Sequence, residues 1–476
     1  MSHFSELLSQ YIQESPYNIK HLASECHIDR TVIQKYISGQ RFPNSYANIN
    51  KITEKLTLTD QQTNLLKKAY DIEKFGLYEY QYLMRTKNII EQMHYIKKLS
   101  FNVEYQFNIN KSFASNKDDL LSLTHFILND CLNTDCELKA SLPANNNLYL
   151  LLKNVACIQK KINLKHILHL ENDYNNHQNM FNLSQFENCL STLVADNITV
   201  KYIYDNFISN LQSQSAYVYT IHSKNYSLLI NSQLNSGILL TGDESTHLKM
   251  QFDRAFNDAS LYNKRFFSSM SYLNAYSVLE NKYTDISLIA RNINILYVLD
   301  NDLLDRHFIG TKEEEEQLKE LLESYKQYIT NILPYHQLDM YFSKEGLYDF
   351  VESGIINDFP SSFFTPFNKK EVSLLIKRLI NLTKHYSNFH LNMIEDQQFK
   401  LPLNCFIAYQ QNSEVLITFK NNDHYHSCIL NEITIKKEFF NLNQLIKIEN
   451  YAYDNDYTLA YLNSLTKKSV KKGITL

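Results

Sequence analysis

The sequence predicts a multidomain protein in which an all-α N-terminal helix-turn-helix domain is followed by two α/β lobes. Two observations indicate this fold class. Apolar residues recur with a helical period near the N-terminus, and strand-like and helix-like runs alternate beyond residue 100. The length of 476 residues corresponds to about three domains. The predicted divisions are residues 1–72 for the helix-turn-helix domain, 73–99 for a linker helix, 100–260 for the first lobe, 261–335 for a helical connection and 336–476 for the second lobe.

The composition excludes several classes of protein. Hydrophobic residues make up 44% of the chain and charged residues 21%, and the net charge is -4, so any basic surface must be local. No run of about 18 apolar residues is present, so no membrane partner is expected. No glycine-rich phosphate-binding motif occurs, and the seven cysteines include no C-x-x-C pair. We therefore expect a cytoplasmic protein with reduced thiols, without a cofactor and without a metal ion.

The N-terminal hundred residues have a helical pattern. The first apolar face is formed by Phe4, Leu7, Leu8, Tyr11 and Ile12, which follow one another at helical spacings. The pattern continues from Asp60 to about Lys98, which predicts one or two helices that connect the N-terminal domain to the remainder of the chain.

Residues 18–43 contain the most informative motif, NIKHLASECHIDRTVIQKYISGQRFP. The apolar faces of two short helices are visible in it, formed by Leu22 and Ala23 and by Val32, Ile33 and Tyr36. Asp29 is a favoured N-cap for the second helix, and Gly39 is a favoured residue at its end. The residues from Cys26 to Asp29 are left for a tight turn. The motif therefore predicts a helix-turn-helix.

This segment resembles the DNA-binding domain of the lambda-repressor/Cro-type (XRE) family over about residues 4–72. The family pattern L-A-x-x-x-G-V-S-x-x-x-I-S-x-x-E-x-G-x-x-x-P is matched by Leu22, Ala23, Ile28, Ile33, Gly39 and Pro43. Two positions depart from it: His27 stands at the turn glycine, and Ile37 stands at the frequent glutamate. The turn glycine often takes a positive φ, which histidine also tolerates.

The resemblance implies a surface for double-stranded DNA. By the family's docking, the side chains facing base edges in the major groove would be Arg30, Thr31, Gln34 and Lys35. The side chains that position the phosphates would be Asn18, Gln40, Arg41 and Asn44. The local charge agrees, because Arg30 to Lys55 contains five basic residues and one acid, Glu54.

Beyond residue 100 the pattern predicts two α/β lobes. Strand-like runs are expected at Glu137–Leu142, Leu164–Leu170, Ile198–Tyr204, Leu338–Phe342 and Phe389–Ile394, with helices between them. Each lobe also contains a β-hairpin, at 216–230 in the first and 405–419 in the second. The shared order of elements predicts an internal repeat, with 136–260 equivalent to 338–446. Asp205 and Asp396 would occupy matching positions.

The paired lobes are similar to those of phospholipase D-like proteins, whose signature is H-x-K-x-x-x-x-D. His222, Ser223 and Lys224 match its first three positions, but Leu229 stands where aspartate is required. The second lobe contains no H-x-K. This chemistry needs a histidine nucleophile and a second histidine acid, so we expect the lobes to be catalytically inactive.

Two other groups of residues have the composition of a metal site. Asp300, Asp302, Asp305 and His307 lie close together in sequence, but a helix start explains them more simply. His424 and His426 lie on one face of a predicted strand, for which an exposed polar face is the simpler interpretation.

Together these features predict a sequence-specific transcriptional regulator that binds double-stranded DNA as a homodimer. One short helix-turn-helix domain makes few contacts with DNA, so two such domains are expected to bind a two-fold symmetric DNA site. The lobes would dimerise and could sense a small-molecule or peptide effector. The alternative is a ligand- or peptide-receptor of the quorum-sensing type in which sensing is primary. That version usually carries 34-residue helical repeats, and no such period is present here.

Overall fold

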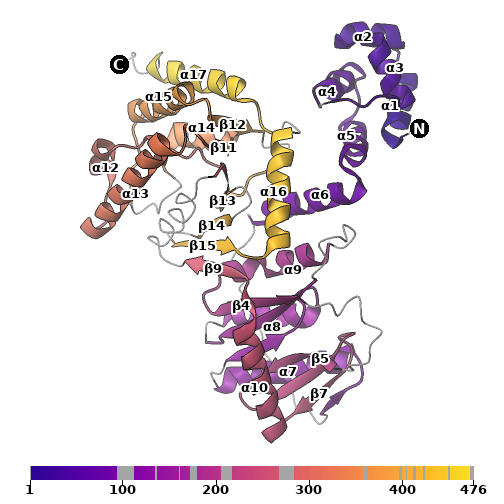
Figure 1. The fold of residues 1–476 in the computed structure, drawn as a ribbon, viewed down its shortest axis with the longest axis vertical. Helices are drawn as coiled ribbons and strands as arrows, with labels where there is room; N and C mark the ends of the chain where they lie inside the picture. The colour runs from indigo at the N-terminus through magenta and orange to yellow at the C-terminus, as the bar shows by residue number, and fades with distance from the viewer. Residues whose placement is uncertain are drawn as a thin grey trace.

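The computed structural model describes residues 2–44, 46–93, 112–134, 137–159, 161–171, 180–204, 217–266, 284–356, 363–395, 399–403, 405–410, 414–421, 424–448 and 451–471. They form an N-terminal helical region and two lobes, each built on one mixed β-sheet (Figure 1). The predicted fold class is therefore confirmed. Asp205 and Asp396 lie outside the described residues.

Five helices form the head, which we define as the described residues up to Phe75. They are α1 (His3–Glu14), α2 (Ile19–Cys26), α3 (Arg30–Ser38), α4 (Tyr46–Lys55) and α5 (Asp60–Phe75). Their apolar faces enclose a core that is separate from those of the lobes and includes Phe4, Leu22, Ile33, Ile49 and Tyr70. The last helix extends past the predicted boundary at residue 72.

The first lobe contains an eight-stranded sheet with the order β1-β7-β6-β5-β2-β3-β4-β8. Its strands are β1 (Phe113–Ala114), β2 (Leu138–Ser141), β3 (Leu164–Leu170), β4 (Ile198–Tyr204), β5 (Tyr217–His222), β6 (Ser227–Asn231), β7 (Gly237–Leu240) and β8 (Ser260–Leu261). Its helices are α7 (Lys117–Thr134), α8 (Asn147–Ile158), α9 (Phe181–Cys189), the short η2 (Leu190–Val194) and α10 (Gly242–Asp258). Strands β2 to β4 are parallel, and β5 to β7 form an antiparallel meander. Helices α7 to α9 share the main core, whereas α10 packs Phe252 and Phe256 on Ile167 of the opposite sheet face.

The second lobe contains a seven-stranded sheet with the order β12-β11-β10-β13-β14-β15-β9. Its strands are β9 (Asn263–Phe266), β10 (Ile286–Ala290), β11 (Leu338–Ser343), β12 (Phe389–Ile394), β13 (Cys405–Gln410), β14 (Val415–Asn421) and β15 (His424–Leu430). Its helices are η3 (Leu296–Val298), α12 (Asn301–His307), α13 (Lys312–Asn331), α14 (Lys344–Ser353), α15 (Lys369–His385), α16 (Ile433–Ile448) and α17 (Asn455–Lys471).

Alternate side chains of this second sheet enter two different cores. On β13, Phe406 and Ala408 belong to the core shared with α12 to α15 and α17, while Ile407 and Tyr409 belong to the core shared with α16 and the first lobe. Figure 1 accordingly shows α12, α13 and α15 on the side of the lobe away from α16. The sheet is therefore covered on both faces.

Apart from the edge strand β8, the two sheets have the same strand order, which supports an internal repeat. The predicted bounds of the repeat are wrong, because Leu138 of β2 is matched by Ile286 of β10 and not by Leu338 of β11. Starting from β1 in the first lobe and β9 in the second, each sheet continues through three meander strands to three parallel strands, so that β2, β3 and β4 are equivalent to β10, β11 and β12. The predicted hairpins are also equivalent, because β5–β6 and β13–β14 occupy matching places.

The predicted helical connection at 261–335 needs correction. It contains α12 and α13, but it also contains β9 and β10, which are strands of the second sheet. The second copy of the repeat therefore begins at β9, well before residue 336. Strand β10 pairs in parallel with β11 and antiparallel with β13, which places it in the interior of that sheet.

Helix α6 (Leu77–Gln92) anchors the head to the lobes. It follows α5 after the single residue Gly76, whose φ of +89° is a conformation that favours glycine. It packs on α16 and on α9, and Arg85 Nη2 lies 2.6 Å from Glu187 Oε2 of α9. Helices α10 and α16 are equivalent in the repeat, because each follows the last meander strand of its lobe. Their surroundings differ, since α16 packs against α6 and α9 while α10 is largely exposed.

Among the described residues, every helix is too short or too polar to cross a lipid bilayer.

Candidate nucleic-acid interface

Helix α3 is held in place by buried contacts with the rest of the head. Its inward residues Ile33 and Tyr36 are almost fully buried. The Ser5 hydroxyl donates a 2.7 Å hydrogen bond to the Tyr36 carbonyl, and the Asn48 side-chain amide donates to the Tyr36 hydroxyl at 3.2 Å. These contacts fix which face of α3 points outward. They join positions 31 and 12 residues apart in sequence, which the helical pattern alone does not reveal.

The turn before α3 has the predicted backbone geometry. His27 takes φ +53° and ψ +41°, so the residue that replaces the family's glycine adopts the left-handed conformation. The Ile28 N–H donates to the Ala23 carbonyl at 3.0 Å, which closes the end of α2. Helix α2 extends through Cys26, so the turn is shorter than the predicted segment. Gly39, with φ +73°, ends α3 as expected.

Asp29 caps α3 and accepts hydrogen bonds from Thr31, one of the predicted base-reading residues. Its carboxylate accepts hydrogen bonds from the Thr31 N–H at 2.7 Å and from the Thr31 hydroxyl at 2.5 Å. The hydrogen bond from the Thr31 hydroxyl is the main reason that the pKa of Asp29 is lowered. The hydroxyl of Thr31 is thus engaged within the head. Arg30, Gln34 and Lys35 are exposed on the same helix.

The four predicted phosphate-positioning residues are exposed at the edges of these helices. Asn18 caps α2 by accepting a hydrogen bond from the His21 N–H at 2.9 Å. Gln40, Arg41 and Asn44 lie in the segment between α3 and α4. The Arg41 N–H donates to the Lys35 carbonyl at 3.2 Å, which ties this segment to the end of α3.

One basic residue of this region has an acidic partner. Lys55 Nζ lies 3.3 Å from Glu25 Oε2, and both side chains are more than two-fifths exposed. The local positive charge is therefore smaller than the count over 30–55 suggests. Glu25 precedes that range in sequence, so the count did not include it.

The region around His222 is a closed structural site. His222 is 0% exposed, and its Nδ1 lies 2.8 Å from the Ser227 hydroxyl. Burial lowers its pKa most, and with smaller contributions from Lys139 and Lys249 the pKa is about 3. The following turn is held by Asp130, which accepts hydrogen bonds from Ser223 at 2.6 Å and from the Asn225 amide at 2.8 Å.

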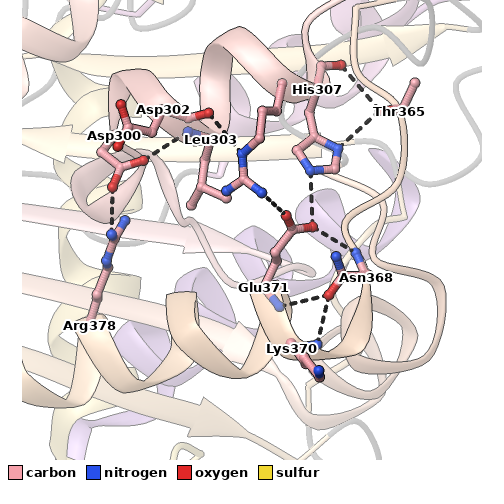
Figure 2. Close-up of polar contacts among 10 residues, drawn as sticks. Asp300, Asp302, Leu303, His307, Thr365, Asn368, Lys370, Glu371 and Arg378 are labelled. Carbon is pink, nitrogen blue, oxygen red and sulfur yellow. Dashed lines mark hydrogen bonds and ion pairs between the residues drawn. The ribbon is translucent and has the colours of Figure 1, made fainter.

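The acidic residues near the start of α12 form a brace between helices (Figure 2). Asp300 caps the helix by accepting a hydrogen bond from Leu303, and it pairs with Arg378 of α15 at 2.5 Å. His307 Nε2 lies 2.9 Å from Glu371, and its Nδ1 lies 3.0 Å from the Thr365 hydroxyl. The described residues contain no group of three or more side chains suited to a metal ion.

The predicted helix start agrees with the geometry of the first of these two groups. Asp305 pairs with Lys319 of α13 at 2.8 Å, and Asp302 lies in the first turn of α12, as a helix start requires. His424 and His426 lie on β15, and His426 is half-buried, so the predicted exposed face is wrong at that position.

Comparisons with known proteins do not place the chain in a family. No protein-family model and no curated protein matches it. A solved structure of TrmBL2, described as an archaeal chromatin protein with a novel mode of DNA binding, matches with a TM-score of 0.18 and 8% sequence identity. That match covers 55% of this chain and 94% of TrmBL2. Similarity of this extent carries no conclusion about the present chain.

Proposed function

We propose that this protein is a dimeric, sequence-specific DNA-binding regulator of transcription. The observation that carries the proposal is α3, a capped helix that follows a tight turn and exposes Arg30, Gln34 and Lys35 on the head. An exposed helix of this kind can enter the major groove, where arginine and lysine recognise guanine and glutamine recognises adenine. Arg41 beside the end of α3 is suited to a phosphate.

Two alanine variants distinguish base reading from phosphate contact. Gln34→Ala should weaken binding to a selected operator by about 1–3 kcal/mol while leaving binding to random DNA nearly unchanged. Arg41→Ala should weaken both by a similar factor and flatten the dependence of affinity on salt. The measurement is a titration of the full chain with a site selected from random DNA, at several salt concentrations.

Lys68→Ala is the matched control, because Lys68 is exposed on α5 and outside the predicted interface. The Lys68→Ala variant should change neither the affinity for the operator nor the affinity for random DNA. Equal losses on operator and random DNA for Gln34→Ala would exclude a base-reading role. Failure of the full chain to select any sequence would exclude the proposed function.

We propose further that the lobes do not catalyse phosphodiester hydrolysis and instead dimerise and sense an effector. His222 is enclosed, and Leu229 occupies the position of the required aspartate. A nucleophile must reach the phosphorus atom, so an enclosed imidazole cannot act. The full chain should show no hydrolysis of an activated phosphodiester above background. Hydrolysis that disappears in His222→Ala would contradict this part of the proposal.

A further inference from the structure

Three side chains of the second lobe form a hydrogen-bonded relay where α12 ends (Figure 2). His307, the last residue of α12, has its Nδ1 3.0 Å from the Thr365 hydroxyl and its Nε2 2.9 Å from Glu371 Oε2 of α15. A hydroxyl, an imidazole and a carboxylate joined in this order are the arrangement by which proteins activate a hydroxyl nucleophile. We call these three side chains the relay.

The carboxylate end of the relay is ionised and fixed in place. Glu371 is almost fully buried, its Oε2 also accepts a hydrogen bond from the Asn368 N–H at 3.1 Å, and its Oε1 lies 2.7 Å from Arg306 Nη1. Burial raises the pKa of Glu371, but the hydrogen bonds from Asn368 and His307 and the charge of Arg306 outweigh burial, so the pKa is lowered. Near pH 7 this carboxylate therefore only accepts hydrogen bonds.

The hydrogen bonds determine which nitrogen of His307 carries the proton. Because Glu371 is an acceptor, the neutral imidazole has its proton on Nε2, so Nδ1 accepts a hydrogen bond from the Thr365 hydroxyl. The same hydroxyl lies 3.4 Å from the His307 carbonyl oxygen, so its shorter contact is with Nδ1. The Thr365 N–H donates to that carbonyl at 2.9 Å, which holds the hydroxyl beside the ring. The imidazole is therefore placed to remove the hydroxyl proton.

The nucleophile end of the relay is open to solvent, whereas the base is shielded. Thr365 is exposed, while the side chain of His307 is 12% exposed and has the ring of Phe367 against it, with a distance of 4.4 Å between ring centroids. Ile309 is 56% exposed, and its segment pairs antiparallel with the segment of Thr365. The hydroxyl thus lies next to an exposed apolar side chain, which suits a reactant with a short hydrocarbon chain.

We propose that Thr365 is a nucleophile that accepts an acyl group from an activated carboxylic ester, with His307 as general base and Glu371 as positioning residue. Thr365 Oγ attacks the carbonyl carbon while His307 Nδ1 takes the hydroxyl proton. The bond from carbon to the leaving oxygen then breaks, and that oxygen takes the proton from Nδ1. Water attacks the acyl-threonine next and gives a proton to Nδ1. The carboxylic acid leaves as Thr365 Oγ recovers that proton. This activity goes beyond DNA binding and does not involve His222.

An ester and a covalent probe test the nucleophile. The full chain should hydrolyse 4-nitrophenyl butyrate, and an alkyl fluorophosphonate should form an adduct in which Thr365 Oγ replaces fluoride, located by mass spectrometry of peptides. Thr365→Val, similar in shape but without a hydroxyl, should lose the adduct and the protein-dependent hydrolysis. Thr365→Ser should keep both, because its hydroxyl attacks from the same position. Thr330→Val is the matched control, since the exposed Thr330 donates to the Lys326 carbonyl instead of a histidine, and it should behave like the wild type.

Variants of the other two members test the relay itself. His307→Gln should slow adduct formation by about 100-fold or more, which is the contribution of a general base. Glu371→Gln keeps a hydrogen-bond acceptor but removes the charge that stabilises the protonated imidazole. The rise of the reaction rate with pH should therefore move to lower pH in Glu371→Gln. A purely structural role of Glu371 would leave this pH profile where it is.

Each outcome supports or overturns the proposal. It is wrong if the wild type forms no adduct on Thr365, if Thr365→Val keeps the hydrolysis, or if a folded Thr365→Ser loses both reactions. It is also wrong if a folded His307→Gln reacts at the rate of the wild type. Circular dichroism shows which variants fold, and the Thr365 variants decide the question if His307→Gln does not fold. None of these readouts depends on whether the head binds DNA.

Discussion

Acidification from pH 7 to pH 4 is expected to destabilise the first lobe by about 3 kcal/mol for each of two buried histidines. His166 and His222 are both 0% exposed, and burial lowers the pKa of each from 6.5 to about 3. Both imidazoles are therefore neutral in the folded chain at pH 4, although they are protonated in the unfolded chain. Since the unfolded state binds more protons between about pH 6.5 and 3, stability is full above this window and falls within it.

The surroundings of the two histidines explain why both pKa values are lowered. The pKa of His222 is lowered mainly by burial and also by the positive charges of Lys139 and Lys249, whereas Asp253 raises it. The pKa of His166 is lowered mainly by burial and also by His169, whereas the hydrogen bond with the Leu142 carbonyl raises it. Both residues lie in the first lobe, so acid should affect that lobe strongly.

The measurement is denaturant unfolding of the full chain at pH 7 and pH 4, followed by circular dichroism because the chain contains no tryptophan. His222→Asn cannot be protonated at pH 4, so the loss of stability between the two pH values should shrink by about 3 kcal/mol. His247→Asn, at an exposed position on α10, should leave that loss unchanged. An unaltered difference in a double His166→Asn/His222→Asn variant would contradict the prediction.

Gly354→Ala is expected to destabilise the second lobe by about 3 kcal/mol or more. Gly354 ends α14 with φ +68°, and a Cβ atom there would lie 2.0 Å from the Phe367 carbonyl oxygen. That segment cannot easily move, because Phe367 is 4% exposed and the next residue, Asn368, caps α15. The variant therefore combines left-handed strain with a backbone clash.

Gly242→Ala separates these two effects. Gly242 has φ +64°, but the nearest atom to its Cβ is the end of the Glu244 side chain at 3.9 Å. Alanine at this position should lower the free energy of unfolding only through the strain of the left-handed conformation, which is about 1–2 kcal/mol. Unfolding of both variants in denaturant gives the comparison. Equal losses would mean that the Phe367 segment yields to the new methyl group.

The sequence was informative where local rules determine the structure. The cap residue Asp29, the terminating Gly39 and the tolerance of His27 for positive φ all concern neighbouring residues, so α3 could be placed with its observed bounds. The equivalence of the two β-hairpins followed from matching runs and turns. The prediction that α3 reads DNA concerns a partner, and it stays a prediction.

The interior strand β10 could not be identified from its sequence. All five residues of Ile286–Ala290 are buried, so the run has no alternation of polar and apolar positions. A short apolar run of this kind resembles a piece of buried helix, and helices follow it in sequence. The pairing of Lys55 with Glu25 was equally invisible, since the two residues lie 30 positions apart.

The position of α16 has a consequence for synthesis of the chain on the ribosome. The head is complete once α5 has emerged, and its separate core allows it to fold early. Helix α6, however, packs its buried residues Leu83, Ile89 and Ile90 near a helix that ends only at Ile448. At about 5–20 residues per second, the intervening chain takes roughly 20–70 s to appear. During that interval α9 can already pack on α6, but the face of α6 that contacts α16 stays uncovered, so nascent chains should engage a chaperone at that face until α16 arrives.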